Sequence, residues 1–240
     1  MTQRQRLDKF LAHMRFGTRR EVKTLVRAGR VTINGKVATS SDLSLCPDRD
    51  VVAVDGQPVK YQEYFYFMLN KPAGYLTATK DRLAPTVLDL VPEEWRVKDL
   101  APVGRLDKDT EGLLLLTTDG PLTHRLLSPT WETPKTYFLR IDGEPTDEEL
   151  KTLERGVVLD DGYRTRPAEV KLLTTGPEWE LVLTICEGKF HQVKRMLQAV
   201  GKQVTYLQRR SMGTLSLDPG LALGECRPLT AEEINGLKGR

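Results

Sequence analysis

The most informative stretch of the chain is residues 104–112, which read GRLDKDTEG and are followed by four leucines. Its acids Asp107, Asp109 and Glu111 occupy positions one, three and five of a calcium-binding EF loop. Position twelve would then be Thr118, where such a loop needs a bidentate glutamate, and the flanking residues have no helical pattern. The spacing therefore argues against calcium chemistry.

Two interpretations of these acids remain open. Aspartates in loops usually belong to solvated turns that have no chemical function. Arg105 and Leu106, however, place a cation and an apolar residue beside Asp107, as expected for a carboxylate in a specific site and not in a solvated turn. On either interpretation we expect Asp109 and Glu111 to be surface acids of the same turn.

No glycine-rich dinucleotide fingerprint or phosphate-binding loop occurs in the sequence, so we expect no nucleotide cofactor. The three cysteines, Cys46, Cys186 and Cys226, are widely spaced and form no CxxC pair. This spacing argues against a zinc site or a disulfide framework and favours buried free thiols. We therefore expect an activity that needs neither a metal nor a cofactor.

The chain has the composition of a folded protein, with 39% hydrophobic and 29% charged residues. No apolar run approaches the roughly eighteen residues of a membrane span, and charges occupy the N-terminal MTQRQRLDKF where a signal peptide has an apolar core. We expect a cytoplasmic monomer that does not contact membranes.

Charge is distributed unevenly along the chain. Residues 1–60 contain 12 lysines and arginines against 6 acids, whereas the other 180 residues contain 24 against 27. Such a basic end on a nearly neutral body is typical of a module that binds a polyanion. On charge alone, a solvated basic face is an equal alternative.

The basic segment has the pattern of two helices and a hairpin. Four apolar residues share the helical spacing i, i+3, i+4 and i+7: Leu7, Phe10, Leu11 and Met14. Thr18 and Glu21 form a capping box that opens a second helix, which ends near Gly29. Four basic residues share the face of that helix opposite its apolar side: Arg19, Lys23, Arg27 and Arg30. The pair Asn34-Gly35 then predicts a tight hairpin turn.

These features resemble the RNA-binding domain named after ribosomal protein S-four, over roughly residues 4–50. The resemblance implies that the second helix and the hairpin bind structured RNA. Residues 55–63 are polar and contain a glycine and a proline, as in the end of a domain and a linker. We therefore expect an RNA-binding domain with linker at residues 1–60 and a second domain at 61–240.

From Tyr64 onward, short strands outnumber helices. We expect strands at residues 64–69, 113–117, 135–141, 168–173, 180–185 and 204–207. We expect helices at residues 147–155, 190–200 and 231–237. Because strands and helices do not alternate strictly, the fold class is α+β with a largely antiparallel mixed sheet.

Four motifs of the second domain occur in the order found in pseudouridine synthases. They are LNKPAG at residues 69–74, GRLDKDTEGLLLLTTDG at 104–120, KTY at 135–137 and EGKFHQVKRM at 187–196. The C-terminal RPLTAEE fits as well. The chain thus resembles this family over nearly all of residues 64–235, in particular the RsuA branch.

The resemblance implies roles for several residues. Asp107 would be the catalytic carboxylate, and Lys71 with Pro72 would form a structural motif. Tyr137 would stack on the base, although the strand pattern alone favours an ordinary aromatic residue of the core. Conversion of uridine to pseudouridine needs one positioned carboxylate and a pocket that retains the detached uracil. This requirement agrees with a sequence that has no cofactor motif.

A helix over residues 190–200 distinguishes two cations as partners of Asp107. Its apolar stripe consists of Val193, Met196, Leu197 and Val200. Lys194 lies at the border of this stripe, whereas Arg195 lies nearly opposite it, at about 100° per residue. We therefore expect Lys194 to reach the carboxylate and Arg195 to face solvent or RNA.

The family resemblance implies the substrate and the partner. We expect isomerisation of a uridine in 16S ribosomal RNA, uridine 516, within the small subunit or an assembly intermediate of it. The alternatives are a large-subunit target or an inactive RNA-binding assembly factor. The residues expected to contact RNA are Arg19, Lys23, Arg27, Arg30 and Arg105.

Overall fold

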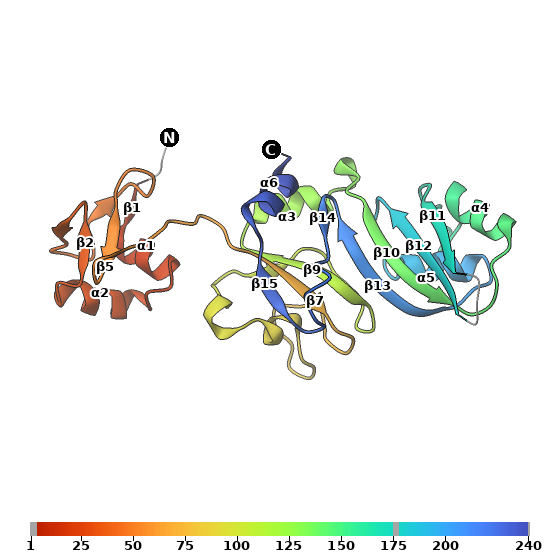
Figure 1. Cartoon of the computed structure of the whole chain (residues 1–240), viewed down its shortest axis with the longest axis horizontal. Coiled ribbons are helices and arrows are strands. Elements are labelled where there is room, and N and C mark those ends of the chain that lie inside the picture. Colours follow the sequence, from red (N-terminus) through yellow and green to blue (C-terminus); the bar gives the residue numbers. More distant parts are fainter. Residues whose placement is uncertain (1–3, 175–177, 240) are drawn as a thin grey trace. The chain divides into compact units, whose positions relative to one another are not determined.

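The computed structural model describes residues 4–174 and 178–239, which form two compact units. The first unit ends at Tyr64 and the second begins at Phe65, whereas the sequence pattern placed the change after residue 60. In Figure 1 the first unit is drawn in red to orange, and the second runs from the orange of β7 through yellow and green to blue.

The first unit packs two helices against short strands. Its helices are α1 (Leu7–His13) and α2 (Arg19–Arg27). Its strands are β1 (Gln5–Arg6), β2 (Val31–Ile33), β3 (Lys36–Val37), β4 (Ser44–Leu45), β5 (Val52–Val54) and β6 (Gln57–Pro58). The described strands form a sheet of order β3-β2-β5-β6 and a separate β1-β4 pair. The apolar faces of both helices join this sheet in a core of their own.

Local sequence signals determine this unit. Thr18 Oγ1 accepts from the amide of Glu21 at 3.3 Å, and the Glu21 carboxylate accepts from the amide of Thr18 at 2.6 Å. The expected capping box at the start of α2 is therefore confirmed. Asn34 and Gly35 have φ values of 50° and 79°, so the expected turn joins β2 to β3.

The second unit is built on one large mixed sheet. Its strands are β7 (Tyr66–Lys71), β8 (Ala101–Pro102), β9 (Glu111–Thr117), β10 (Lys135–Ile141), β11 (Glu169–Thr174), β12 (Trp179–Ile185), β13 (Val204–Met212), β14 (Leu215–Ser216) and β15 (Cys226–Pro228). Among the described residues the order is β11-β12-β10-β13-β9-β7-β15, with β14 on β13 and β8 on β9. Only β13 and β9 pair in parallel in this part of the chain, so the expected α+β fold with a largely antiparallel sheet is confirmed.

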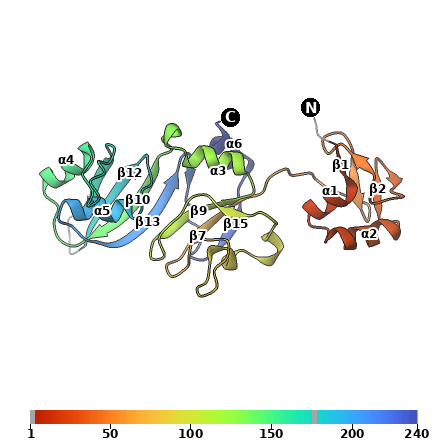
Figure 2. The same ribbon diagram turned by 180° about the vertical axis from the view of Figure 1, so that it is seen from behind.

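The helices cover the sheet at different strands. They are η1 (Val87–Leu90), η2 (Glu93–Trp95), α3 (Gly120–Leu127), η3 (Pro129–Trp131), α4 (Asp147–Arg155), α5 (Gln192–Ala199) and α6 (Ala231–Lys238). Apolar residues of α4 and α5 share one core with strands β10 and β12. Helices α3 and α6 lie side by side in both views (Figures 1 and 2), and Arg125 of α3 donates to the carbonyl of Leu237 in α6 at 2.6 Å.

The sequence pattern missed α3 and misplaced several ends. Helix α3 begins after Asp119, whose carboxylate accepts from the amide of Leu122 at 2.9 Å, and it was hidden because it follows the strand directly. Helix α5 begins at Gln192, since His191 has a left-handed φ of 48°. Strand β13 continues to Met212, beyond the expected end at residue 207, because its arginines interrupt the apolar pattern.

Strand β9 follows the Asp107 segment and anchors it in the interior. Its four leucines, residues 113–116, are all at most 1% exposed, so both faces of the strand are covered. Gly112 has a φ of +97°, and a Cβ there would lie 2.3 Å from the carbonyl oxygen of Arg209. Only glycine permits this close approach of β9 to β13.

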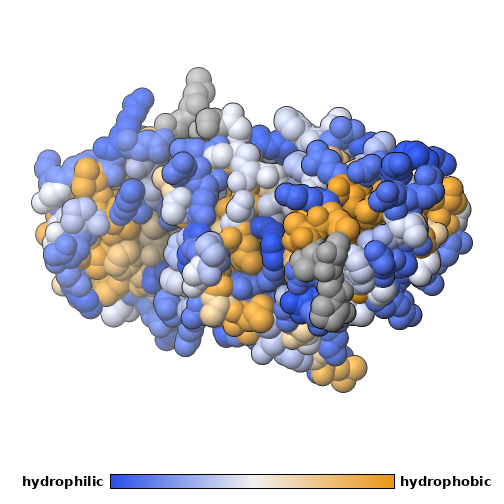
Figure 3. Space-filling view, turned by 45° about the vertical axis from the view of Figure 1, so that its right-hand side comes forward, coloured by the Kyte–Doolittle hydropathy of each residue, from blue (hydrophilic) through white to orange (hydrophobic). Residues whose placement is uncertain are grey.

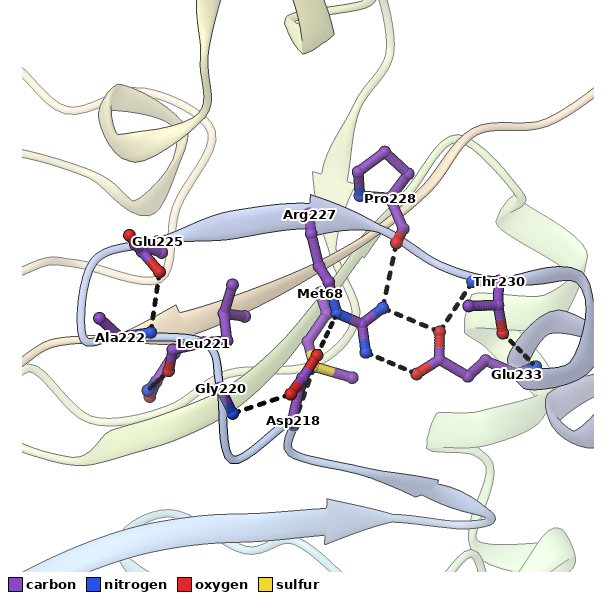
Figure 4. A network of polar contacts seen from close by, with 11 residues as sticks. Met68, Asp218, Gly220, Leu221, Ala222, Glu225, Arg227, Pro228, Thr230 and Glu233 are labelled. Atoms are coloured by element: carbon purple, nitrogen blue, oxygen red, sulfur yellow. Dashed lines mark hydrogen bonds and ion pairs between the residues drawn. The ribbon is translucent and has the colours of Figure 1, made fainter.

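A polar network closes the C-terminal part of the sheet (Figure 4). Arg227 in β15 donates to Asp218 at 2.7 Å and makes a two-pronged contact with Glu233 at 2.8 and 3.0 Å. These bonds lower the pKa of Glu233 and raise that of Arg227. Because Glu233 also caps α6 with Thr230, one arginine joins the last strand to the last helix.

Figure 3 shows hydrophilic residues over much of one face, with apolar patches between them. None of the helices in the described part of the chain is long and apolar enough to cross a membrane.

Candidate active site

Asp107 lies in the connection between β8 and β9, where the backbone is held on both sides. Thr77 Oγ1 donates to the carbonyl of Leu106 at 2.7 Å and accepts from its amide at 3.2 Å. The amide of Thr110 donates to the carbonyl of Asp107 at 3.1 Å. These bonds give the carboxylate of Asp107 a defined position.

A buried lysine supports the same connection from below. The Nζ atom of Lys71, at the end of β7, donates to the carbonyls of Pro72 at 3.0 Å, Lys108 at 3.2 Å and Thr110 at 2.8 Å. The side chain is fully buried, and this burial lowers the pKa of Lys71 to about 8. Lys71 therefore fixes the turn that carries Asp107, which agrees with the structural role that the motif implies.

Two basic side chains from the start of α5 face Asp107. Lys194 Nζ lies 3.5 Å from one carboxylate oxygen, and His191 Nε2 lies 3.5 Å from the other. The side chain of Asp107 is 27% exposed, so it remains open to a substrate on one side. The structure thus brings together Asp107 and the lysine that helical geometry selected, residues that are far apart in the sequence.

Lys194 is shared between two acids, which the sequence did not indicate. Its Nζ atom lies 2.6 Å from Asp109, closer than to Asp107, and this hydrogen bond lowers the pKa of Asp109. Asp109 is 72% exposed, as expected of a surface acid, but it takes part in the site. Asp109 is therefore the expected surface acid and, in addition, a partner of Lys194.

Glu111 is also more than a surface acid. It accepts from the hydroxyl of Tyr206 at 2.8 Å and from the amide of Ala73 at 3.4 Å. Burial together with the hydrogen bond to Glu111 raises the pKa of Tyr206 to about 12. Glu111 thus connects the beginning of β9 to β13 and to the loop after β7.

Arg195 does not face solvent as expected. Its guanidinium contacts Asp160 and lies 2.7 Å from Asp161, and only 14% of the side chain is exposed. It also donates to the carbonyl of Phe190 at 3.3 Å. Helical geometry placed Arg195 away from the core correctly but could not reveal the acidic turn that covers it.

Tyr137 lies in β10, opposite Leu183 of β12 and Arg209 of β13. Its ring belongs to the core beneath the sheet and is 8% exposed. Within the described residues its hydroxyl forms no hydrogen bond.

Arg209 is a buried cation that the sequence did not reveal. It is 2% exposed, its Nε donates to the carbonyl of Leu113 at 2.9 Å, and its Nη2 has no hydrogen-bond partner in the described chain. The pair Arg209-Arg210 resembles ordinary surface charge, and only the alternation along β13 would have placed Arg209 inside.

The residues expected to contact RNA are exposed. In the first unit Arg19, Lys23 and Arg27 project from α2, whereas Arg30 forms a two-pronged ion pair with Asp55 at 2.6 and 2.8 Å. Arg105 is exposed two residues before Asp107. The basic face of α2 therefore has three exposed cations and one that is held by an acid.

No cluster of three or more His, Cys, Asp or Glu residues that could hold a metal ion occurs in residues 4–174 and 178–239. The cysteines Cys46, Cys186 and Cys226 are free and half-buried. The basic groups that the structure places beside Asp107 are Lys194 and His191.

Comparison with known proteins defines the class. The RNA pseudouridylate synthase family matches residues 65–199, and the S4 domain matches residues 5–51. The chain belongs to the pseudouridine synthase family and is an isomerase that acts on RNA. The family resemblance stated from the sequence is confirmed.

Individual relatives are similar over nearly their whole length. An uncharacterized RNA pseudouridine synthase of Bacillus subtilis, YtzG, is 51% identical over 96% of this chain and 97% of its own. The Escherichia coli ribosomal small subunit pseudouridine synthase A is 42% identical over 95% of this chain and 98% of its own. A crystal structure of a pseudouridylate synthase, 35% identical, covers 97% of this chain and 99% of its own with a TM-score of 0.68.

Proposed function

We propose that this enzyme isomerises one uridine of small-subunit ribosomal RNA, uridine 516 of 16S rRNA, during maturation of that subunit. The support is the similarity to the small-subunit synthase of Escherichia coli, which extends over both units of the chain. The exposed cations Arg19, Lys23 and Arg27 of the first unit, together with Arg105, would contact RNA phosphates.

We further propose that Asp107 carries the chemistry. It acts at the ribose, as nucleophile or as base, while the bond from C1′ to N1 of uracil breaks. The base turns, C5 bonds to C1′, the C5 hydrogen leaves as a proton, and N1 gains a proton. The reaction is an isomerisation and consumes no co-reactant.

Three other residues have supporting roles in this proposal. Lys194 and His191, each 3.5 Å away, hold the carboxylate in place. Tyr137 stacks on the detached uracil and keeps it in the pocket, with its hydroxyl free to contact the base. The observation that carries the assignment is that Asp107 lies in a turn held by backbone bonds, has Lys194 and His191 beside its carboxylate, and is still open on one side.

Asp107→Asn tests the assignment, because asparagine keeps the shape but is neither a nucleophile nor a base. Release of tritium from C5-labelled rRNA should fall by several orders of magnitude, whereas a mere packing defect of about 1.4 kcal/mol would cost about tenfold. RNA binding and the unfolding curve should remain unchanged. The matched control is Asp99→Asn at an exposed position, which should keep full activity. Near-normal turnover in Asp107→Asn would refute the assignment.

A further inference from the structure

Phe190 is an exposed aromatic residue in the turn before α5. Its side chain is 73% exposed, although most phenylalanines of a folded chain are buried. One face of its ring stacks on His191, with centroids 3.7 Å apart and an interplanar angle of 19°. The exposure therefore belongs to the other face of the ring.

This ring pair starts at the proposed catalytic carboxylate. The edge of His191 lies 3.5 Å from Asp107, so the rings extend outward from the site. A base that stacked on the free face of Phe190 would be separated by the Phe190 ring from His191, the residue that contacts Asp107. This position suits the base of a nucleotide next to the target uridine. The target base itself stacks on Tyr137 in the proposed function.

The turn is held rigidly, so the exposed ring has a defined position. Gln192 accepts from the amide of Lys189 at 2.8 Å and donates to the buried Glu187 at 2.6 Å. Arg195 donates to the carbonyl of Phe190 at 3.3 Å. A ring fixed in advance loses little conformational freedom when it binds a ligand.

The RNA substrate needs an aromatic surface of this kind. When a uridine leaves the stack to reach an enzyme, each flanking base loses one stacking neighbour. Aromatic side chains take the place of such neighbours in many RNA-binding proteins, because every base has a flat π-face.

We propose that the free face of Phe190 binds a base next to the target uridine and holds the RNA open around Asp107. This inference rests on the proposed catalytic role of Asp107 and adds a substrate-binding residue to the site. His191 acts in it as the backing layer that sets the height and tilt of the ring.

Phe190→Ala, Phe190→Trp and the control Trp131→Ala test the proposal. Trp131 is also an exposed aromatic residue, 63% exposed, but it packs under Arg125 and not on the turn before α5. The substrate is a C5-tritiated rRNA fragment around uridine 516, made intact or with an abasic ribose at the nucleotide on either side.

On intact RNA, Phe190→Ala should lower kcat/KM between about 5-fold and about 150-fold, the range that corresponds to ~1–3 kcal/mol of base–aromatic stacking. Phe190→Trp and Trp131→Ala should stay near the wild-type value. On RNA that lacks the contacted base, wild type and Phe190→Ala should become equal.

Two outcomes would overturn the proposal: a loss below twofold in Phe190→Ala, or the same loss on both abasic RNAs as on intact RNA. A wild-type enzyme that modifies large-subunit rRNA instead would refute the proposed target alone. The same comparison around that uridine would then decide the role of Phe190.

Discussion

Replacing Lys71 with methionine tests how the turn that carries Asp107 is held. Methionine fills a similar volume but donates nothing to the carbonyls of Pro72, Lys108 and Thr110. We expect lower turnover, because the turn loses its fixed position. We also expect a change in the pH dependence of stability, which a general loss of packing would not produce.

The size of that change follows from the pKa of Lys71, which is about 8 in the folded chain and 10.5 without burial. Because the folded value is lower, the unfolded chain binds more protons between the two values, and the free energy of unfolding rises with pH across this window. Keeping the buried ammonium charged at pH 7 costs about 3 kcal/mol. Roughly 2 kcal/mol of this cost is relieved by about pH 9.5.

Urea unfolding followed by tryptophan fluorescence measures the effect in the second unit alone, since Trp95, Trp131 and Trp179 all lie there. Other groups titrate in both proteins, including Cys226, whose pKa burial raises to about 12. Their contributions cancel in the difference between wild type and Lys71→Met. That difference should change by about 2 kcal/mol between about pH 7 and 9.5 in favour of wild type. If the free energies of unfolding of wild type and Lys71→Met changed in parallel with pH, this account would be refuted. The control is Lys108→Met at an exposed position, for which we do expect a parallel change.

Further changes have defined outcomes. Lys194→Met should lower tritium release, because it removes the charge 3.5 Å from Asp107, yet change the free energy of unfolding by less than about 1 kcal/mol. Asp109→Asn should lower turnover several-fold, because Lys194 then closes on Asp107 and weakens it as a nucleophile; turnover equal to wild type would show that the sharing has no effect. Without residues 1–60, rRNA binding should weaken and depend less on salt in a filter-binding titration, and an unchanged salt slope would contradict this. Gly112→Ala should destabilise the second unit, because its Cβ would lie 2.3 Å from the carbonyl oxygen of Arg209. We expect urea unfolding to show a loss several times the ~1–3 kcal/mol that backbone strain alone would cost.

Local signals in the sequence were enough to predict several elements closely. The expected ranges 135–141 and 147–155 coincide with β10 and α4, since a β-rich run and a capping box at Thr146 mark them. The turn at Asn34-Gly35 was equally clear. Each of these signals acts within a few residues and does not depend on the rest of the fold.

Local signals could not predict contacts between segments that are far apart in the sequence. Helical geometry selected Lys194 because the stripe of α5 defines which side chains border the core. It could not show that Asp109, 85 positions away, would compete for the same ammonium group. The hydrogen bond from Arg209 to the carbonyl of Leu113 likewise depends on the parallel pairing of β13 with β9, which no local pattern reveals.

The position of β13 also determines when the site can form during synthesis. This strand lies between β9 and β10 but is made after both of them, and β15 completes the edge beside β7 later still. The first unit has its own core and can fold as soon as it emerges from the ribosome. A chain interrupted before residue 204 would leave β9 and β10 with unpaired edges, which favour aggregation. A nascent chain can therefore hold a folded RNA-binding unit well before it acquires a working catalytic centre.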